Sequence, residues 1–270
     1  MEKTNFRKII GTNEYKFIVL GDPHIDSDYS DKKLLKKHLQ FALDNNIDVY
    51  CIGDLLDVMQ GRHDPRRKNK QDKDHYFNHI INYVTDFLTP YKDVIKFVSY
   101  GNHETSVIKN NDLDLLEIIV NNLNLLGANI KLGSYSGWWQ FRLTHGTSNY
   151  GYKVNYHHGF GGGGKRTKGL IQYTDRQVGL GDVDMIIMGH VHEDTDSYHT
   201  IEYINNKGII CEKDVIWTRV SSYKNENIGN GWAVEKGFNP KPVGAKLYTI
   251  NYNKHIGITE TQITRLGRLC

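Results

Sequence analysis

Cysteine is scarce in this sequence of 270 residues, which contains only Cys51, Cys211 and Cys270. Their number is odd and no two share a Cys-x-x-Cys spacing, so the chain encodes neither a disulfide framework nor a thiolate zinc site. Long apolar runs are also missing, since none approaches the roughly 20 residues of a membrane-spanning helix and no signal-peptide core is present. We therefore expect a soluble, cytoplasmic protein that does not bind membranes.

A large excess of charge of either sign is absent as well. The 34 basic and 31 acidic residues leave a net charge of +3, which is too near balance for a protein that coats DNA through bulk charge. Hydrophobic residues make up 39% of the chain and aromatic residues 11%, a balance typical of a folded protein. Histidine is plentiful, with 13 residues, and imidazole is the commonest metal-ligating side chain. The abundance of histidine therefore makes a metal site one of the first functions to consider.

The first half of the chain alternates between strand-like and helix-like patterns. Apolar runs predict strands at 15–20, 47–52 and 94–100. Helical spacing predicts helices that begin after Asp31, cover 75–88, and run from Asp112 or Asp114 to about 126. This alternation indicates an α/β architecture with right-handed crossovers.

The second half is richer in strands. We expect strands at 136–145 and 150–158, a helix at 167–180, a strand at 185–188, a hairpin of 197–204 with 209–220, and a strand at 245–252. Neither a repeat nor a linker is visible. We therefore predict a single domain over 1–270, with a core at about 15–195 that carries the motifs and a β-rich C-terminal portion at about 196–270.

Four predicted strands end in a glycine that is followed at once by a side chain able to bind a metal. The pairs are Gly21-Asp22, Gly53-Asp54, Gly101-Asn102 and Gly189-His190. In open α/β sheets, sites form at the carboxyl ends of strands, where side chains from several loops converge. Each pair alone is explained as well by an ordinary turn, but four of them at strand ends indicate one shared site.

With these motifs the chain resembles the calcineurin-like metallophosphoesterases. The resemblance spans about residues 16–192 and rests on Asp22-x-His24, Gly53-Asp54-x-x-Asp57, Gly101-Asn102-His103-Glu104 and Gly189-His190-x-His192. It implies a four-layer sandwich of two mixed β-sheets flanked by helices, with two metal ions at the strand ends. His-His-Gly at 157–159, before a glycine-rich loop, is similar to versions of this family carried by phages and mobile elements.

The resemblance also implies a role for each motif residue. It gives the first metal to Asp22, His24 and His192, makes Asp54 the bridge, and gives the second metal to Asn102, His190 and one further histidine. It places His103 at the leaving oxygen, Asp57 behind His103, and Glu104 in support of the same loop.

The further histidine is not settled by the motifs. His157-His158 and His145 both follow strand-like segments, and each is followed by glycine. We favour the His157-His158 pair, and because adjacent strand residues point to opposite faces, we expect only one of the two to bind metal.

Two divalent ions about 3.5 to 4 Å apart can clamp a phosphate and activate a water molecule. Mixed carboxylate, amide and imidazole ligands suit Mn²⁺ best here, with Fe or Zn²⁺ as alternatives. The implied reaction is therefore hydrolysis of a phosphoester.

The substrate is less defined than the reaction. Protein phosphatases of this family usually place Arg-Gly after the second Asp of the Gly-Asp-x-x-Asp motif, where this chain has Val58-Met59. Basic segments at 62–70 and 165–168, together with the aromatic residues Trp138, Trp139, Tyr150, Tyr152 and Tyr156, could contact phosphates and bases. The ordinary interpretation of those aromatic residues is hairpin core.

We therefore favour a phosphodiesterase that acts on DNA or RNA and is similar to the nuclease subunits of DNA-break repair complexes. The alternatives are a small-molecule phosphomonoesterase or nucleotide hydrolase, and a catalytically silent metal-bound scaffold.

Overall fold

The computed structural model describes most of the chain. The described residues are 4–58, 75–162, 164, 166–225, 234, 237, 239–255 and 258–268. The basic segment 62–70 and Lys165, which the sequence suggested as phosphate contacts, lie outside them. Within the described part, no helix is long and apolar enough to cross a membrane.

One six-stranded sheet has the strand order β1-β6-β7-β8-β10-β9. Its strands are β1 (Thr4–Ile9), β6 (Ser136–His145), β7 (Ser148–His157), β8 (Met185–Met188), β9 (Thr195–Ile204) and β10 (Ile210–Arg219). The sheet is mixed, because β7, β8 and β10 run parallel whereas the β6–β7 and β9–β10 pairs are antiparallel.

The second six-stranded sheet has the order β12-β11-β2-β3-β4-β5. Its strands are β2 (Glu14–Leu20), β3 (Asp48–Ile52), β4 (Ile95–Ser99), β5 (Lys131–Gly133), β11 (Gly244–Asn253) and β12 (Ile258–Gly267). It is also mixed, since β2 to β5 run parallel and β11 is antiparallel to both of its neighbours. C-terminal strands therefore complete both sheets.

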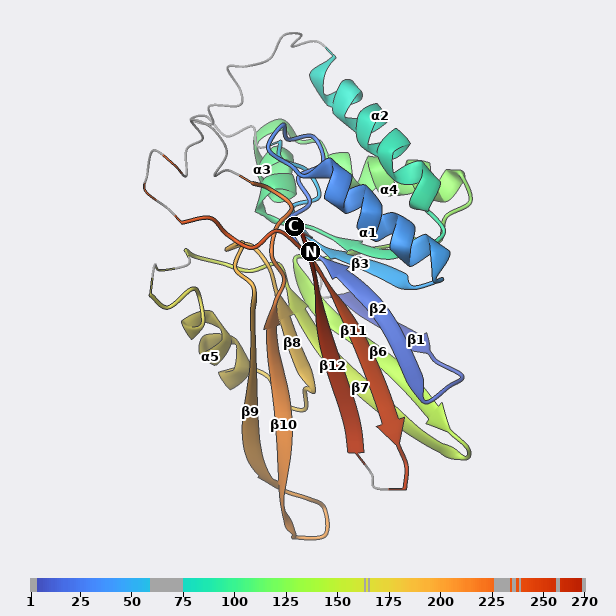
Figure 1. The fold of residues 1–270 in the computed structure, drawn as a ribbon, viewed down its shortest axis with the longest axis vertical. Coiled ribbons are helices and arrows are strands. Elements are labelled where there is room, and N and C mark those ends of the chain that lie inside the picture. The colour runs from blue at the N-terminus through green and yellow to red at the C-terminus, as the bar shows by residue number, and fades with distance from the viewer. Residues whose placement is uncertain are drawn as a thin grey trace.

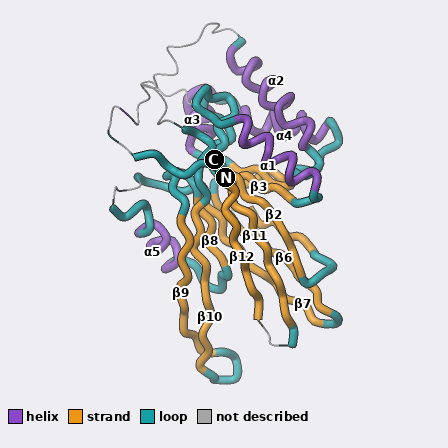
Figure 2. Tube along the Cα trace, in the orientation of Figure 1, coloured by secondary structure: helices purple, strands orange, loops and turns teal. Residues whose placement is uncertain are grey.

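The helices lie on the outer faces of the two sheets. They are α1 (Lys32–Asp44), α2 (Tyr76–Leu88), the 3₁₀ turn η2 (Thr89–Tyr91), α3 (Asn102–Asn111), α4 (Leu115–Leu125) and α5 (Ile171–Val178). Figure 1 and Figure 2 show α1 to α4 gathered beside the second sheet, and α5 beside the first.

Three apolar clusters hold these layers together. The cluster between the sheets is aromatic, and Phe17, Tyr50 and Trp139 are fully buried in it. A second cluster joins the other face of the second sheet to its helices, and a third joins the first sheet to α5, where the rings of Tyr173 and Trp217 stack 5.5 Å apart. Helix, sheet, sheet and helix therefore form four layers, which confirms the predicted sandwich of two mixed sheets.

Most predicted elements are present close to their expected bounds. Asp31 caps α1 by accepting a hydrogen bond from the N–H of Leu34, and Asp114, not Asp112, caps α4. The segment predicted as a helix at 167–180 is helical only over α5.

Besides the short turn η2, four of the described elements were missed. Helix α3 begins at Asn102, inside a motif that was interpreted as a loop. The strands β1, β5 and β12 are short or half-exposed and contain few apolar residues. These strands form because they exchange main-chain hydrogen bonds with a neighbouring strand, and a local pattern does not reveal that neighbour.

Candidate active site

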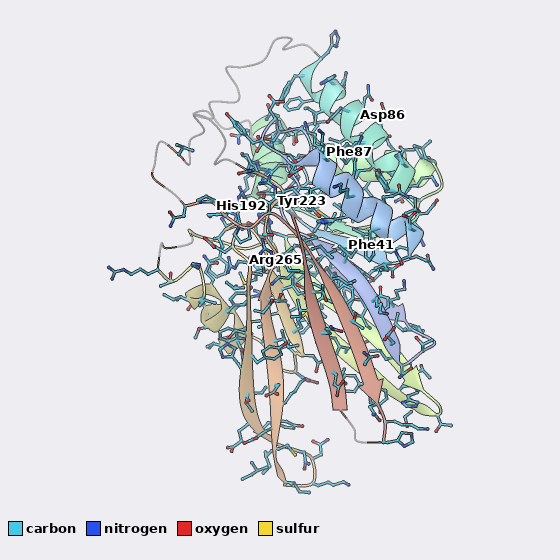
Figure 3. The ribbon with its side chains drawn as sticks, in the orientation of Figure 1. Phe41, Asp86, Phe87, His192, Tyr223 and Arg265 are labelled. Atoms are coloured by element: carbon cyan, nitrogen blue, oxygen red, sulfur yellow. The ribbon has the colours of Figure 1, made fainter. Side chains whose placement is uncertain are left out.

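The predicted site residues follow strands whose carboxyl ends meet. β2, β3 and β4 are parallel neighbours in one sheet, and β7 and β8 are parallel neighbours in the other. The site residues are Asp22 and His24 after β2, Asp54 and Asp57 after β3, Asn102 and His103 after β4, His158 after β7, and His190 and His192 after β8. His192 is labelled in Figure 3, at the end of the strands nearest the helices.

The first group able to hold a metal ion consists of Asp22, His24 and His192. One potential ligand atom from each lies within 4.8 Å of the others, and Nε2 of His192 is 3.7 Å from Oδ1 of Asp22. Asp22 Oδ1 and His24 Nε2 are buried and have no hydrogen-bond partner among the described residues. Buried polar atoms without partners are costly, so these two atoms fit a bound cation.

The second group consists of Asp54, His158 and His190, within the same 4.8 Å limit. Nε2 of His158 lies 3.3 Å from Oδ2 of Asp54 and 3.0 Å from Oδ1 of Asn102, so Asn102 belongs to the same group. Nδ1 of His158 lies 2.9 Å from the carbonyl oxygen of Ile52. A proton on Nδ1 donates to that oxygen, which directs Nε2 at the other donors.

His190 also has its ring fixed by the main chain. Nε2 of His190 lies 3.0 Å from the carbonyl oxygen of Gly161. A hydrogen bond from Nε2 to this oxygen leaves Nδ1 as the atom that can bind a metal. The glycine-rich loop after His158 therefore contributes to the site by orienting His190.

A third group, of His24, Asp57 and His103, overlaps the first. Nδ1 of His103 lies 2.7 Å from the main-chain oxygen of Asp57 but 3.8 Å from its carboxylate. The Asp57 carboxylate instead lies 3.3 Å from Nδ1 of His24 and accepts a 2.8 Å hydrogen bond from Nζ of Lys224. Asp57 thus holds His103 through its backbone, whereas its side chain faces His24 and Lys224.

The charges of the site depend on one another. Burial alone would raise the pKa of Asp54, but the neighbouring His158 and His103 lower it well below its usual value. Burial alone would lower the pKa of His158, but the carboxylates of Asp54 and Asp22 raise it to about 10. The cluster therefore attracts positive charge, and a cation that binds there must displace the proton on His158.

Five of the predicted ligands have a left-handed backbone. They are Asp22 (φ 45°), His24 (φ 45°), Asp54 (φ 48°), His190 (φ 70°) and His192 (φ 56°). This conformation costs a non-glycine residue roughly 1–2 kcal/mol, and residues held in it cluster at functional sites. In this conformation the side chains of the three loops point into the same small volume.

Two motif glycines provide space for the ligands. Gly53 has φ of 93°, and a Cβ atom there would lie 2.5 Å from Nδ1 of His158. A Cβ atom on Gly101 would lie 2.1 Å from Oδ1 of Asp54. These glycines are required because a side chain would overlap the metal-binding group.

Of the alternative histidines, the structure brings only His158 to the cluster. Nδ1 of His157 accepts a hydrogen bond from the N–H of Gly159, and its ring contacts Tyr135 and Phe160. Burial lowers the pKa of His157 to about 3. His145 lies at the opposite end of β6, because Ser136, the first residue of that strand, pairs with His157. The adjacent histidines thus point apart, as the strand geometry predicts.

The interpretation of the hairpin aromatic residues as stacking surfaces is wrong for three of them. Trp139, Tyr152 and Tyr156 are buried in the core between the sheets, and Trp138 and Tyr150 are half-buried. Alternation along β6 and β7 sends these rings inward, where they pack and cannot reach a substrate.

Three polar residues were missed by the sequence analysis. Asp26 accepts a hydrogen bond from the N–H of Asp57 at 2.5 Å, and its place two residues after His24 was an available signal. Lys224 reaches Asp57, and the buried guanidinium of Arg219 donates to the carbonyl oxygen of Gly189 at 3.2 Å. Neither of these two follows a motif, so only the tertiary structure reveals them.

Comparisons with known proteins give weak similarities. No family model matches this chain, and no curated protein matches it. One similar solved structure is GAP50, the anchor in the inner membrane complex of Plasmodium, with 13% identity and a TM-score of 0.44 over 94% of this chain and 85% of that one.

Two other solved structures are similar at lower scores. Vps29 from Chaetomium thermophilum has 12% identity and a TM-score of 0.36 over 93% of this chain and 96% of its own. A metallophosphoesterase from Sphaerobacter thermophilus has 9% identity and a TM-score of 0.32 over 92% of this chain and 88% of its own. Because all three TM-scores are below 0.5, they give no argument for a shared function.

Proposed function

We propose that this protein is a two-metal phosphoester hydrolase of the calcineurin-like metallophosphoesterase type. The observation that carries the proposal is the pair of adjoining groups, Asp22, His24 and His192 beside Asp54, His158 and His190, with potential ligand atoms within 4.8 Å inside each group. Two buried atoms of the first group, Oδ1 of Asp22 and Nε2 of His24, have no hydrogen-bond partner within the described part of the chain, which supports it further.

The donor atoms fit two divalent ions, and we propose Mn²⁺, with Fe or Zn²⁺ as alternatives. The groups offer carboxylate and imidazole atoms, the amide oxygen of Asn102 adjoins the second, and neither contains cysteine, which suits these metals. When bound, such ions would neutralise charge on a phosphate and lower the pKa of the attacking water.

The side chains of this chain supply the remaining chemistry. His103 keeps a proton on Nδ1 by donating to the main-chain oxygen of Asp57, and its Nε2 lies 3.6 Å from Oδ2 of Asp54. A second proton on Nε2, stabilised by that carboxylate, can pass to the leaving oxygen of the substrate. Asp57 pairs with Lys224 and faces His24, so the loop that carries Asp57, whose main-chain oxygen holds His103, is braced from two sides.

We propose a phosphodiester of DNA or RNA as the substrate, as in the phage-type and DNA-repair nucleases that the motifs resemble. Arg166 and Lys168 are exposed on the loop that follows Gly161, whose carbonyl oxygen meets His190. Basic side chains at this place favour a polyanionic ligand, since contacts to phosphate provide most of the affinity for nucleic acids.

The assay that tests the proposal compares four substrates with the Mn²⁺-loaded protein. Single-stranded DNA, double-stranded DNA and bis(p-nitrophenyl) phosphate are diesters, and p-nitrophenyl phosphate is a monoester. We expect hydrolysis of bis(p-nitrophenyl) phosphate and of at least one DNA. Turnover of the monoester alone would indicate a small-molecule phosphomonoesterase, and bound Mn²⁺ with no turnover of any ester would indicate a silent scaffold.

A further inference from the structure

A hollow lined with basic side chains lies beside the candidate active site. It has a volume of about 360 Å³ and lies between the segment that precedes β11 and the end of β12. Its lining residues are Lys241, Pro242, Val243, Arg265, Gly267 and Arg268. Three of these are basic, and the hollow is here called the basic groove; each basic side chain also meets a carboxylate outside the lining, namely Glu193, Asp194 or Asp31.

The basic groove adjoins the loop that carries two predicted metal ligands. Nζ of Lys241 donates to the carbonyl oxygen of Val191 at 2.6 Å, and Val191 lies between His190 and His192. Nε of Arg265 is 2.9 Å from Oδ2 of Asp194, two residues after His192. Arg265 and His192 are both labelled in Figure 3, in the same part of the molecule.

The arginine residues of the groove keep N–H donors that the nearby acidic residues do not use. The buried Lys246 is shared by Asp194 and Asp196, with Nζ 2.7 Å and 2.6 Å from an oxygen of each, and Nζ of Lys241 lies 3.8 Å from Oε1 of Glu193. The groove therefore offers an anion unused N–H donors rather than an excess of positive charge. Arg265 contacts Asp194 through Nε, one of its five N–H donors, and its side chain is 51% exposed. Arg268 is 42% exposed, with Nε 2.9 Å from Oδ2 of Asp31 and its terminal nitrogen atoms near the amide of Asn225.

We infer that the basic groove binds a second phosphate of a nucleic-acid strand, next to the phosphate that is hydrolysed. This inference rests on the proposed function. None of the groove residues belongs to the three described groups able to hold metal, so a ligand that occupies both places must extend beyond the phosphate that is hydrolysed. Guanidinium groups match the geometry of phosphate oxygens, and Pro242 and Val243 give the groove an apolar wall.

Binding without turnover tests the groove independently of catalysis. The probe is a fluorescent oligothymidylate of eight nucleotides, titrated with the protein in EDTA at several salt concentrations. For Arg265→Gln with Arg268→Gln, we expect Kd to rise at least tenfold and the salt dependence to fall by about one to two phosphate contacts. The matched control is Lys37→Gln with Lys207→Gln, which removes the same charge from exposed sites elsewhere and should change Kd less than twofold.

Turnover in the presence of Mn²⁺ then tests whether one nucleic-acid strand contacts the basic groove and the metal-binding groups at the same time. In the wild-type protein, KM should fall from thymidylyl-thymidine, which has one phosphate, to the eight-nucleotide strand. In the arginine variant, KM should no longer depend on the length of the strand. Its kcat/KM should fall at least tenfold more on the eight-nucleotide strand than on bis(p-nitrophenyl) phosphate.

Several results would overturn the groove assignment. They are an unchanged Kd in the double variant, an unchanged length dependence of KM, or binding of phosphatidylserine vesicles in place of the oligonucleotide. If the double variant does not fold, Arg268→Gln alone, which leaves Asp194 untouched, should still raise Kd at least threefold. Failure of the wild type to cleave bis(p-nitrophenyl) phosphate would count against the proposed function, whereas the EDTA titration judges the groove alone.

Discussion

The carboxylate of Glu104 accepts a 3.1 Å hydrogen bond from the main-chain N–H of Asp54, the residue predicted to bridge the metals. It also accepts from the N–H groups of Leu56, at 2.9 Å, and Gly101, at 2.8 Å. Burial and then the charge of Asp54 raise the pKa of Glu104, whereas these hydrogen bonds oppose the rise. Because all three partners are donors, they fit the ionised form, which joins the loops after β3 and β4.

Glu104→Gln should therefore destabilise the protein and weaken metal binding. The amide offers one oxygen where the carboxylate offers two, so a donor of the glutamine must face a main-chain N–H. We expect the free energy of unfolding to fall by about 2 kcal/mol, measured by urea denaturation. Glu117→Gln, on the exposed face of α4, is the control and should change stability by less than about 0.5 kcal/mol. Equal effects of the two variants would contradict this role of Glu104.

Asp54→Asn and His103→Ala should each lower turnover of bis(p-nitrophenyl) phosphate at least about a hundredfold, the scale of lost acid-base assistance. The reason is that Asp54 belongs to a metal-capable group and His103 lies beside it. Circular dichroism would check that both variants remain folded, and the exposed His79→Gln is the control. A loss smaller than threefold in either variant would show that its role is assigned wrongly.

The adjacent histidines of β7 and its exit loop form a matched pair. His158→Gln should weaken Mn²⁺ binding about a hundredfold or more, measured by isothermal titration calorimetry, because it removes Nε2 from the group that contains Asp54. His157→Gln should change the affinity less than threefold, since Nδ1 of His157 is bound to the N–H of Gly159. The reverse order of effects would assign the ligand to His157.

Gly101→Ala tests whether the motif glycine provides space. Its backbone is extended, with φ of −113°, so alanine is allowed there, but the new methyl group would lie 2.1 Å from Oδ1 of Asp54. We expect stability to fall by about 2 kcal/mol, the scale of overpacking, with a clear loss of Mn²⁺ affinity. Gly181→Ala, which meets no atom within 4 Å, should change neither quantity. If Gly101→Ala changed neither the stability nor the Mn²⁺ affinity, the loops after β3 and β4 would have room to move apart.

The pH dependence of stability should contain a contribution from His38 on α1. Burial lowers the pKa of His38 to about 4, and its Nδ1 lies 2.7 Å from the hydroxyl of Tyr223. In the unfolded chain its pKa is about 6.5, so between these values the unfolded state binds the proton more readily. The stability due to neutral His38 is therefore complete above about pH 6.5 and is lost as the pH falls toward 4.

Urea denaturation at pH 7 and pH 5 measures this contribution. From pH 7 to pH 5 the wild type should lose about 1 kcal/mol more stability than His38→Gln, because at pH 5 only the wild type must release the proton of this imidazole in order to fold. His79→Gln, which alters an exposed histidine, should follow the wild type. Parallel losses in wild type and His38→Gln would contradict the prediction.

Local patterns predicted much of the fold because apolar periodicity and caps act over short distances. The strands that precede Asp22, Asp54 and His190 each end in an apolar run, and Asp31 caps α1 where a cap was expected. β1 and β12 escaped prediction because these half-exposed edge strands have mixed composition, and the partner of β1, β6, is distant in the sequence.

The sequence by itself determined which donors stand at the strand ends, and so the kind of chemistry that the site can perform. Only the tertiary structure decided which distant residues join them. His158, rather than His157 or His145, reaches Asp54, and Lys224 and Arg265 approach the site from beyond the motifs. The reason is physical: a strand's periodicity is local, whereas contact between side chains depends on how strands pair and how two sheets pack across the whole chain.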